Sequence, residues 1–125
     1  MLGKLFSSKD KVPLPWKNLD RISELEEIEN LSKERAVLLF KHSTRCSISA
    51  MALGRFERSY KEEALFEPYY LDLIAHRDIS NEIASRYGVK HESPQAILIR
   101  NGKAVFNTSH MGISYEELNT MAQKE

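Results

Sequence analysis

The chain has little of what marks most specialised classes of protein. It has one cysteine, 5 glycines and 4 prolines among 125 residues, and 18 basic residues balance 18 acidic residues. One cysteine excludes an internal disulfide framework, and the balanced charge gives no sign of nucleic acid as a partner. No apolar run approaches the roughly 20 residues of a membrane span, and the start of the chain lacks the apolar core of a secretory signal. We therefore expect a cytoplasmic protein without membrane contact.

What remains is the composition of one globular domain, with 42% hydrophobic residues. Pro13 and Pro15 follow a first segment of mixed, largely polar residues, so residues 1–17 are expected to form an extended N-terminal arm. Trp16 is expected to hold this arm on the domain, which is expected to cover residues 18–125.

The first two predicted elements are a helix and a buried strand. Apolar residues recur at every third position from 22 to 31, which predicts the helix, and Ser23 with Glu26 has the spacing of a capping box. The continuous apolar run at 36–40 predicts a strand that is buried on both faces of a sheet.

A longer helix is predicted directly after this strand. Its apolar positions follow helical spacing from residue 48 to about residue 64, and Thr44 or Ser47 is available as its cap. This arrangement places Cys46 at a junction between a strand and a helix.

The next two predicted elements are again a strand and a helix. Pro68 introduces a strand at 69–76, and a short helix at 80–87 is expected to stop at Gly88, because glycine accepts the left-handed backbone found after many helices.

A hairpin is predicted near the end of the chain. The apolar runs 96–100 and 103–107 flank Asn101 and Gly102, the strongest short hairpin signal.

A last helix is expected to begin at a second capping box, Ser114 with Glu117. The predicted order is then helix, strand, helix, strand, helix, strand, strand, helix. Strands separated by helices favour parallel pairing, and the hairpin adds an antiparallel pair. The sequence therefore predicts an α/β fold with a mixed sheet of about four strands flanked by helices.

Cys46 has the most informative surroundings. A cysteine in the first turn of a helix faces free N–H groups and the positive end of the helix dipole, which favour thiolate over thiol. A lone cysteine beside a buried strand is more often an inert core residue. The neighbours of Cys46, however, are polar: Ser43, Thr44, Arg45, Ser47 and Ser49. We therefore favour an exposed thiolate, the nucleophile of disulfide exchange, with Arg45 adding to its stabilisation.

Ser49 stands where a C-x-x-C redox motif has its second thiol. A hydroxyl there can donate a hydrogen bond to the Cys46 sulfur but cannot attack a disulfide. A mixed disulfide at Cys46 would then wait for an external thiol, so the segment predicts a cycle with one cysteine. Without Cys46 nearby, Ser49 would be interpreted as a hydroxyl on the helix surface.

Three further features are less informative. X-Pro bonds are cis only about one time in twenty, so spacing alone leaves the isomer of Ser93–Pro94 open. The histidines show no metal-ligand spacing, and no metal site is expected. Arg55 and Arg58 are interpreted as a solvated helix face and not as an anion site.

The segments HSTRCSIS and SPQAILIRNGKAVF resemble the thioredoxin superfamily. More closely, residues 18–122 resemble the monothiol bacilliredoxins, small bacterial proteins in which a strand leads into Thr-x-Cys-Pro-Ile-Ser. The matching positions are Thr44, Cys46, Ile48 and Ser49. Ser47 stands where the family usually has proline, which returns a backbone N–H near the sulfur and leaves open which small thiol is used.

This resemblance implies a thioredoxin-like fold and the removal of bacillithiol, a small sugar-linked thiol, from mixed disulfides on client proteins. Cys46 would be the attacking thiol, with Thr44, Ser47 and Ser49 as candidates to hydrogen-bond to its sulfur.

The resemblance also assigns the second half of the site. Pro94 would be the cis-proline of the superfamily, and Ser93 would offer its backbone to the substrate. Bacillithiol would be a co-substrate with no bound cofactor, its carboxylates could be held by Arg45 or Lys41, and the protein is expected to be a monomer. Two alternatives remain open: a thioredoxin-fold binding module without catalysis, and a glutaredoxin-like protein that uses another small thiol or carries an iron–sulfur cluster.

Overall fold

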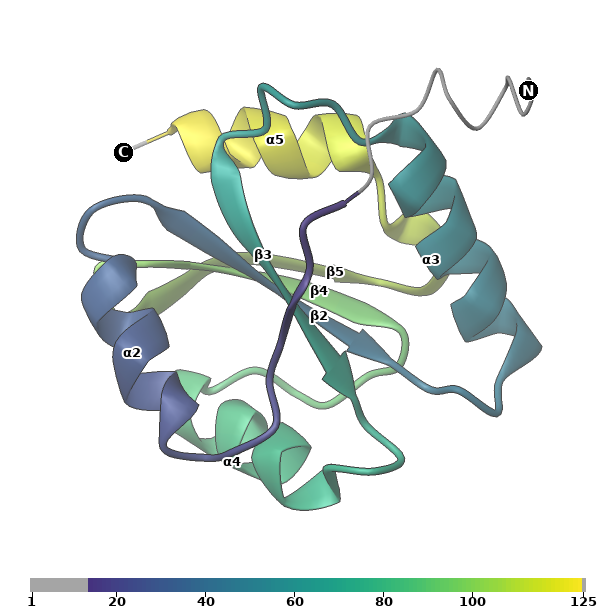
Figure 1. The fold of residues 1–125 in the computed structure, drawn as a ribbon, viewed down its shortest axis with the longest axis horizontal. Coiled ribbons are helices and arrows are strands. Elements are labelled where there is room, and N and C mark those ends of the chain that lie inside the picture. The colour runs from purple at the N-terminus through teal and green to yellow at the C-terminus, as the bar shows by residue number, and fades with distance from the viewer. Residues whose placement is uncertain (1–13, 125) are drawn as a thin grey trace, which may run out of the picture.

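The computed structural model describes residues 14–124, in which a five-stranded mixed sheet lies between two layers of helices (Figure 1). The strands are β1 (Lys17–Asn18), β2 (Ala36–His42), β3 (Phe66–Asp72), β4 (Gln95–Arg100) and β5 (Lys103–Ser109). The helices are α2 (Glu24–Leu31), α3 (Ser47–Ser59), α4 (Arg77–Tyr87), the 3₁₀ helix η1 (His110–Gly112) and α5 (Tyr115–Gln123). The strand order is β1-β3-β2-β4-β5, with β1, β3 and β2 parallel and β4 and β5 antiparallel. The predicted class and element order are confirmed, and one short strand is added.

β2 lies in the centre of the sheet and is buried along its whole length. Its alternate side chains enter two separate cores. Val37 and Leu39 pack with residues of α2 and α4, whereas Leu38 and Phe40 pack with residues of α3 and α5. A strand covered on both faces needs apolar side chains at successive positions, which explains the continuous run in the sequence.

The added strand, β1, pairs with β3 at the edge of the sheet. Trp16, just before it, has its ring centroid 5.7 Å from Phe40, 5.9 Å from Phe56 and 5.8 Å from Tyr70. Its indole N–H donates to the Glu57 carboxylate at 2.8 Å. The predicted anchoring by Trp16 is confirmed, while residues 1–13 of the expected arm lie outside the described residues.

The start of α2 differs from the prediction. Ser23 has helical backbone angles, φ −59° and ψ −23°, and its side chain makes no capping hydrogen bond. The Glu24 carboxylate instead accepts the backbone N–H groups of Asp20 and Arg21, at 2.8 and 2.9 Å. The predicted capping box is therefore wrong, because a serine already in helical conformation does not direct its hydroxyl to the free N–H groups.

The boundaries of β3 also differ. The strand begins at Phe66, so Pro68 lies inside it. Because β1 reaches only the two residues after Pro68, one side of the strand is unpaired at the proline, which lacks an N–H to donate. β3 then ends at Asp72, whose carboxylate accepts two N–H groups of the following turn, instead of continuing to residue 76.

Two helix boundaries also differ from the prediction. α3 ends at Ser59 and not near residue 64, because Tyr60 adopts an extended backbone, with ψ 140°. α4 begins at Arg77 and not at Ser80, so the buried Ile79 belongs to its first turn, one turn before the buried Ile83.

The predicted turns and the last cap are confirmed. Asn101 and Gly102 have φ values of 54° and 73°, and Gly88 ends α4 with φ 64°. Both central residues of the hairpin thus have the positive φ that two-residue turns of this kind require. Ser114 Oγ accepts the Glu117 N–H at 3.2 Å, which caps α5.

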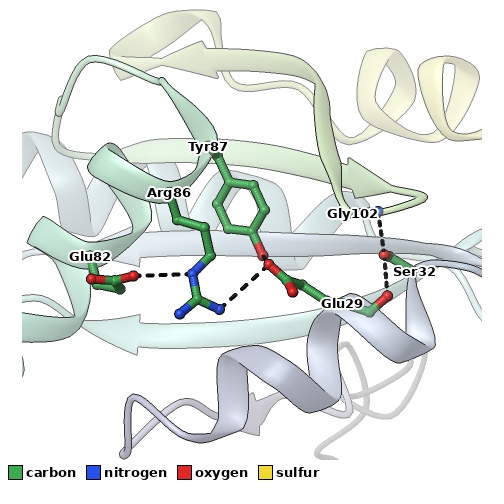
Figure 2. Close-up of polar contacts among 6 residues, drawn as sticks. All are labelled: Glu29, Ser32, Glu82, Arg86, Tyr87 and Gly102. Carbon is green, nitrogen blue, oxygen red and sulfur yellow. Dashed lines mark hydrogen bonds and ion pairs between the residues drawn. The ribbon is translucent and has the colours of Figure 1, made fainter.

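Polar contacts join α2 and α4 at the edge of their shared core (Figure 2). The Glu29 carboxylate accepts hydrogen bonds from Arg86 at 3.4 Å and from the Tyr87 hydroxyl at 3.3 Å, and Arg86 also pairs with Glu82 at 3.1 Å. Burial, followed by the charge of Glu29, raises the pKa of Tyr87 to about 12. Tyr87 therefore remains a hydrogen-bond donor through the neutral range.

Ser32 connects the end of α2 to the β4–β5 hairpin (Figure 2). Its buried hydroxyl donates to the Glu29 carbonyl at 2.7 Å and accepts the Gly102 N–H at 2.9 Å. Its carbonyl accepts the Asn101 N–H at 2.8 Å.

We expect Ser32→Ala to lower the free energy of unfolding by about 1–2 kcal/mol, because the Gly102 N–H loses its acceptor. Urea denaturation measures this change. Ser85→Ala, at an exposed position on α4, is the control and should change stability by less than about 0.5 kcal/mol. Equal effects of the two substitutions would show that Ser32 does not hold the hairpin.

Candidate active site

The junction between β2 and α3, which contains Cys46, follows the end of the sheet where β2 and β3 finish and β4 begins. Cys46 is itself the N-cap of α3, with extended backbone angles of −115° and 122°, so the predicted caps Thr44 and Ser47 are wrong. Cys46 is partly exposed. The Cys46 side chain makes no capping hydrogen bond, but the free N–H groups of the first turn lie at this end of the helix, and the sequence of that turn, Ser-Ile-Ser-Ala, has no acidic residue. A thiolate here would have amide dipoles on one side and access to solvent.

Ser49 is fully buried, and its hydroxyl binds to the end of β2. Its Oγ accepts the Ser43 N–H at 3.0 Å and lies 2.7 Å from Nδ1 of His42. Burial lowers the pKa of His42, so the ring is neutral near pH 7 and can accept the hydroxyl proton at Nδ1. The hydroxyl is engaged by these two partners and not by the Cys46 sulfur. Both earlier interpretations of Ser49, as a donor to the sulfur and as a surface hydroxyl, are therefore wrong.

The residues that flank the thiol in sequence are open to solvent. Thr44, Arg45 and Ser47 are all exposed, so their side chains are accessible to a ligand. Ser47 is the first residue of α3, a position that accepts proline readily. Serine in place of the proline of the family motif therefore adds a backbone N–H donor and leaves the start of the helix intact.

The loop before β4 brings Ser93 and Pro94 to the same end of the sheet. Lys41 pairs with Gln95 in the sheet, which places Pro94 beside the end of β2. The Ser93–Pro94 bond is cis, which settles the isomer that spacing left open. Ser93 Oγ is buried and has no hydrogen-bond partner among residues 14–124, and the Pro94 carbonyl accepts the His110 N–H at 3.0 Å.

Lys41 does not lie where a ligand could reach it. It is fully buried on the side of the sheet that packs against α4, and its Nζ donates to the Ser80 carbonyl at 3.4 Å and lies 3.3 Å from Nδ1 of His91. Burial, and then the charge of Arg77, lower the pKa of Lys41 to about 8. Of the two cations proposed to hold the carboxylates of a small thiol, the structure thus excludes Lys41 and leaves Arg45 exposed.

Arg55 has a structural contact that the sequence does not predict. Its guanidinium donates to the carbonyls of Met111 and Ile113, at 2.9 and 2.8 Å. It therefore holds η1 against α3 and does not belong to a solvated face.

Residues 14–124 contain no group of three or more His, Cys, Asp or Glu side chains placed to hold a metal ion. In the same part of the chain, no helix combines the length and apolar character of a membrane span.

Solved structures with this architecture include two thioredoxins. The thioredoxin of Malassezia sympodialis is 15% identical, with a TM-score of 0.66 over 90% of this chain and 91% of that chain. The thioredoxin of Fasciola hepatica is 20% identical, with a TM-score of 0.65 over 86% of this chain and 96% of that chain. At these identities the likeness establishes the thioredoxin fold alone.

A third structure, described as a proposed oxidoreductase with a thioredoxin fold, is 36% identical, with a TM-score of 0.72 over 85% of this chain and 92% of that chain. Fold and site thus define a thiol–disulfide oxidoreductase of the thioredoxin type. The sequence model of the monothiol bacilliredoxins matches residues 17–118. The chain belongs to the monothiol bacilliredoxin family, which confirms the resemblance drawn from the motif around Cys46.

Ser49→Ala would remove the hydroxyl that joins the end of β2 to α3. We expect the free energy of unfolding to fall by about 1–3 kcal/mol, because the Ser43 N–H and the His42 ring lose their partner in a buried place. Thermal or urea denaturation measures the loss. Ser47→Ala is the matched control at an exposed position, and a loss as large as that of Ser49→Ala would contradict the assigned role.

The buried charge of Lys41 gives a stability prediction with a defined pH range. Between its folded-state pKa of about 8 and the ordinary value of 10.5, the unfolded chain binds more protons than the folded chain, so stability rises with pH there. We expect Lys41→Met to be more stable than the wild type by about 1–3 kcal/mol near pH 7, because the desolvated charge is removed.

The stability difference between the two proteins should shrink as the pH is raised from about 7.5 to about 9.5. Urea denaturation at several pH values measures this trend. A difference that stays constant over the range would mean that Lys41 is not a destabilising buried cation.

Proposed function

We propose that the protein removes bacillithiol from mixed disulfides on client proteins, with Cys46 as its nucleophile. The Cys46 thiolate attacks the bacillithiol sulfur and forms a disulfide with it, and the sulfur of the client leaves as a thiolate that takes a proton from water. The thiolate of a second bacillithiol then attacks the bacillithiol sulfur of this adduct. Bacillithiol disulfide is formed, and Cys46 leaves as a thiolate. One disulfide is consumed and one is produced, so the cycle needs no bound cofactor.

One observation carries the proposal: the only cysteine of the chain is a partly exposed residue at the N-cap of a helix. The helix N-terminus favours the ionised sulfur that exchange requires. At residue 49, a buried serine engaged by His42 replaces the resolving thiol of a two-cysteine cycle. An adduct at Cys46 therefore persists until an external thiol arrives.

The cis-proline loop and Arg45 are proposed to bind the substrate. An extended disulfide substrate could pair with the backbone at Ser93, next to the cis peptide bond. Bacillithiol has carboxylates, and the exposed Arg45 beside Cys46 is proposed to bind them. Thr44 and Ser47 remain candidates to hydrogen-bond to the sulfur.

Mass spectrometry after incubation with bacillithiol disulfide tests the chemistry. We expect one bacillithiol on Cys46, its removal by free bacillithiol, and turnover of a reporter protein that has a single bacillithiol mixed disulfide. Cys46→Ser should abolish both the adduct and the turnover, while circular dichroism confirms that the variant is folded.

The alternatives give different results in the same assay. A folded wild-type protein that forms no adduct with any small disulfide would contradict the enzyme and support a binding module. Faster adduct formation and turnover with glutathione disulfide would contradict bacillithiol as the co-substrate and support a glutaredoxin-like protein.

A further inference from the structure

The last two residues of β2 contact the two halves of the site from opposite faces of the sheet. His42 lies on the α3 side, where its ring is 2.7 Å from Ser49 Oγ. Lys41 lies on the α4 side, where its Nζ is 3.3 Å from Nδ1 of His91. His42 thus holds the helix that follows Cys46, and Lys41 contacts the loop that leads to the cis-proline.

Packing does not explain a lysine at residue 41. Its alternate neighbours on the same face, Val37 and Leu39, belong to the apolar core between the sheet and α2 and α4. An ammonium group with three N–H donors has only two acceptors there among the described residues, at 3.3 and 3.4 Å. A buried charge with so few partners costs folding free energy, and an apolar side chain of similar volume would be better accommodated.

The loop that Lys41 contacts is held at two places. Gln95, at its end, donates to the Lys90 carbonyl at 2.9 Å and accepts the Glu92 N–H at 3.3 Å. His91 lies between these two residues, and its Nδ1 is within 3.3 Å of both Lys41 Nζ and Ser80 Oγ. The His91 contacts connect the loop to β2 and α4, two residues before Ser93.

We propose that Lys41 is a positioning residue that holds the cis-proline loop through His91, so that the Ser93 backbone is presented to the disulfide that Cys46 attacks. The inference rests on the proposed function for its kinetic consequence, whereas its structural part concerns the loop alone. Lys41 never touches the substrate.

The contact sets a condition on the charge of His91. Nδ1 can accept a hydrogen bond from the ammonium only while the ring is neutral. Protonation would place two cations 3.3 Å apart, with Arg77 of α4 adding to the repulsion and Glu92 of the loop opposing it. Burial, Lys41 and Arg77 lower the pKa of His91 accordingly. We therefore expect the loop to loosen in acid.

Hydrogen–deuterium exchange in the Lys41→Met variant tests the structural part. We expect exchange in residues 89–93 to quicken by about tenfold while the segment 47–59, which contains α3, is unchanged. Because the substitution removes a buried charge, global stability should rise while the loop loses protection. No change in the loop, or equal loosening of α3, would overturn the proposal whether or not the protein acts on bacillithiol.

Kinetics test the consequence for the reaction. For a reporter protein with one bacillithiol mixed disulfide, Lys41→Met should raise KM by about fivefold or more, with the alkylation rate of Cys46 within about twofold of the wild type. His91→Gln should show the same increase. KM of the double variant should be no higher than that of either single variant. An increase equal to the product of the two single increases would overturn the proposal that Lys41 acts through His91.

The pH profile separates this role from simple packing. KM of the wild type should rise as the pH falls below the ordinary imidazole pKa of 6.5 and His91 becomes protonated, and this rise should be absent in Lys41→Met. His110→Asn removes the other histidine near the loop, which pairs with Glu92 at 3.5 Å, and should keep the acid-side rise. Loss of the rise in His110→Asn, or its persistence in Lys41→Met, would assign the pH dependence to a different group. If the wild type does not turn over the reporter, the proposed function fails, and the exchange experiment alone decides the role of Lys41.

Discussion

The burial of β2 on both faces is the constraint on which the rest of the structure depends. A polar side chain on such a strand cannot turn to solvent, so it must find its partners inside one core or the other. The strand ends with two such residues, and the period of two places Lys41 and His42 on opposite faces. A shift of one residue in the register with β3 and β4 would exchange them. The same pairing that builds the sheet therefore determines which loop each polar residue contacts.

The candidate site is assembled from three segments that are distant in sequence. The β2–α3 junction supplies the thiol, the loop before β4 supplies Ser93 and Pro94, and η1 closes the arrangement through the His110 N–H and the contacts of Arg55. The first two segments are attached to β2 by the contacts of His42 and Lys41, and η1 is attached to the loop and to α3. The site thus combines an accessible sulfur with a rigid frame, as in-line attack on a disulfide requires.

Much of this fold could be predicted from the sequence, because its strongest signals are local. The apolar run of β2, the Asn101–Gly102 turn and Gly88 each fix a conformation by their own chemistry. The misplaced boundaries arose where tertiary contacts override local preference. Pro68 is tolerated within β3 because its neighbour on one side is too short to pair with it, and Ser23 loses its capping role to Glu24. β1 gives no signal at all, since two exposed residues have no periodicity.

The part of the candidate site around the thiol could be predicted from the sequence, whereas the buried contacts that support it could not. Cys46, the cis-proline and the missing second thiol follow from the motif, but the partners of Ser49 depend on the distance between two elements. Lys41 and His42 directly follow an apolar run, and continuing the alternation of the strand by two residues would have indicated that both are buried. Their partners on α3, on α4 and in the cis-proline loop lie too far away in sequence for any spacing rule.

The hydroxyl of Ser49 also bears on how this protein could change. A thiol at that place would be a weak donor to the imidazole and a weak acceptor for the amide at the strand end, so both bonds at the junction would weaken. Acquiring a resolving sulfur would thus loosen the frame that orients the first one. If Cys46 acts as proposed, its dependence on an external thiol is built into this junction, and a change to a two-thiol enzyme would have to rebuild the buried imidazole contact.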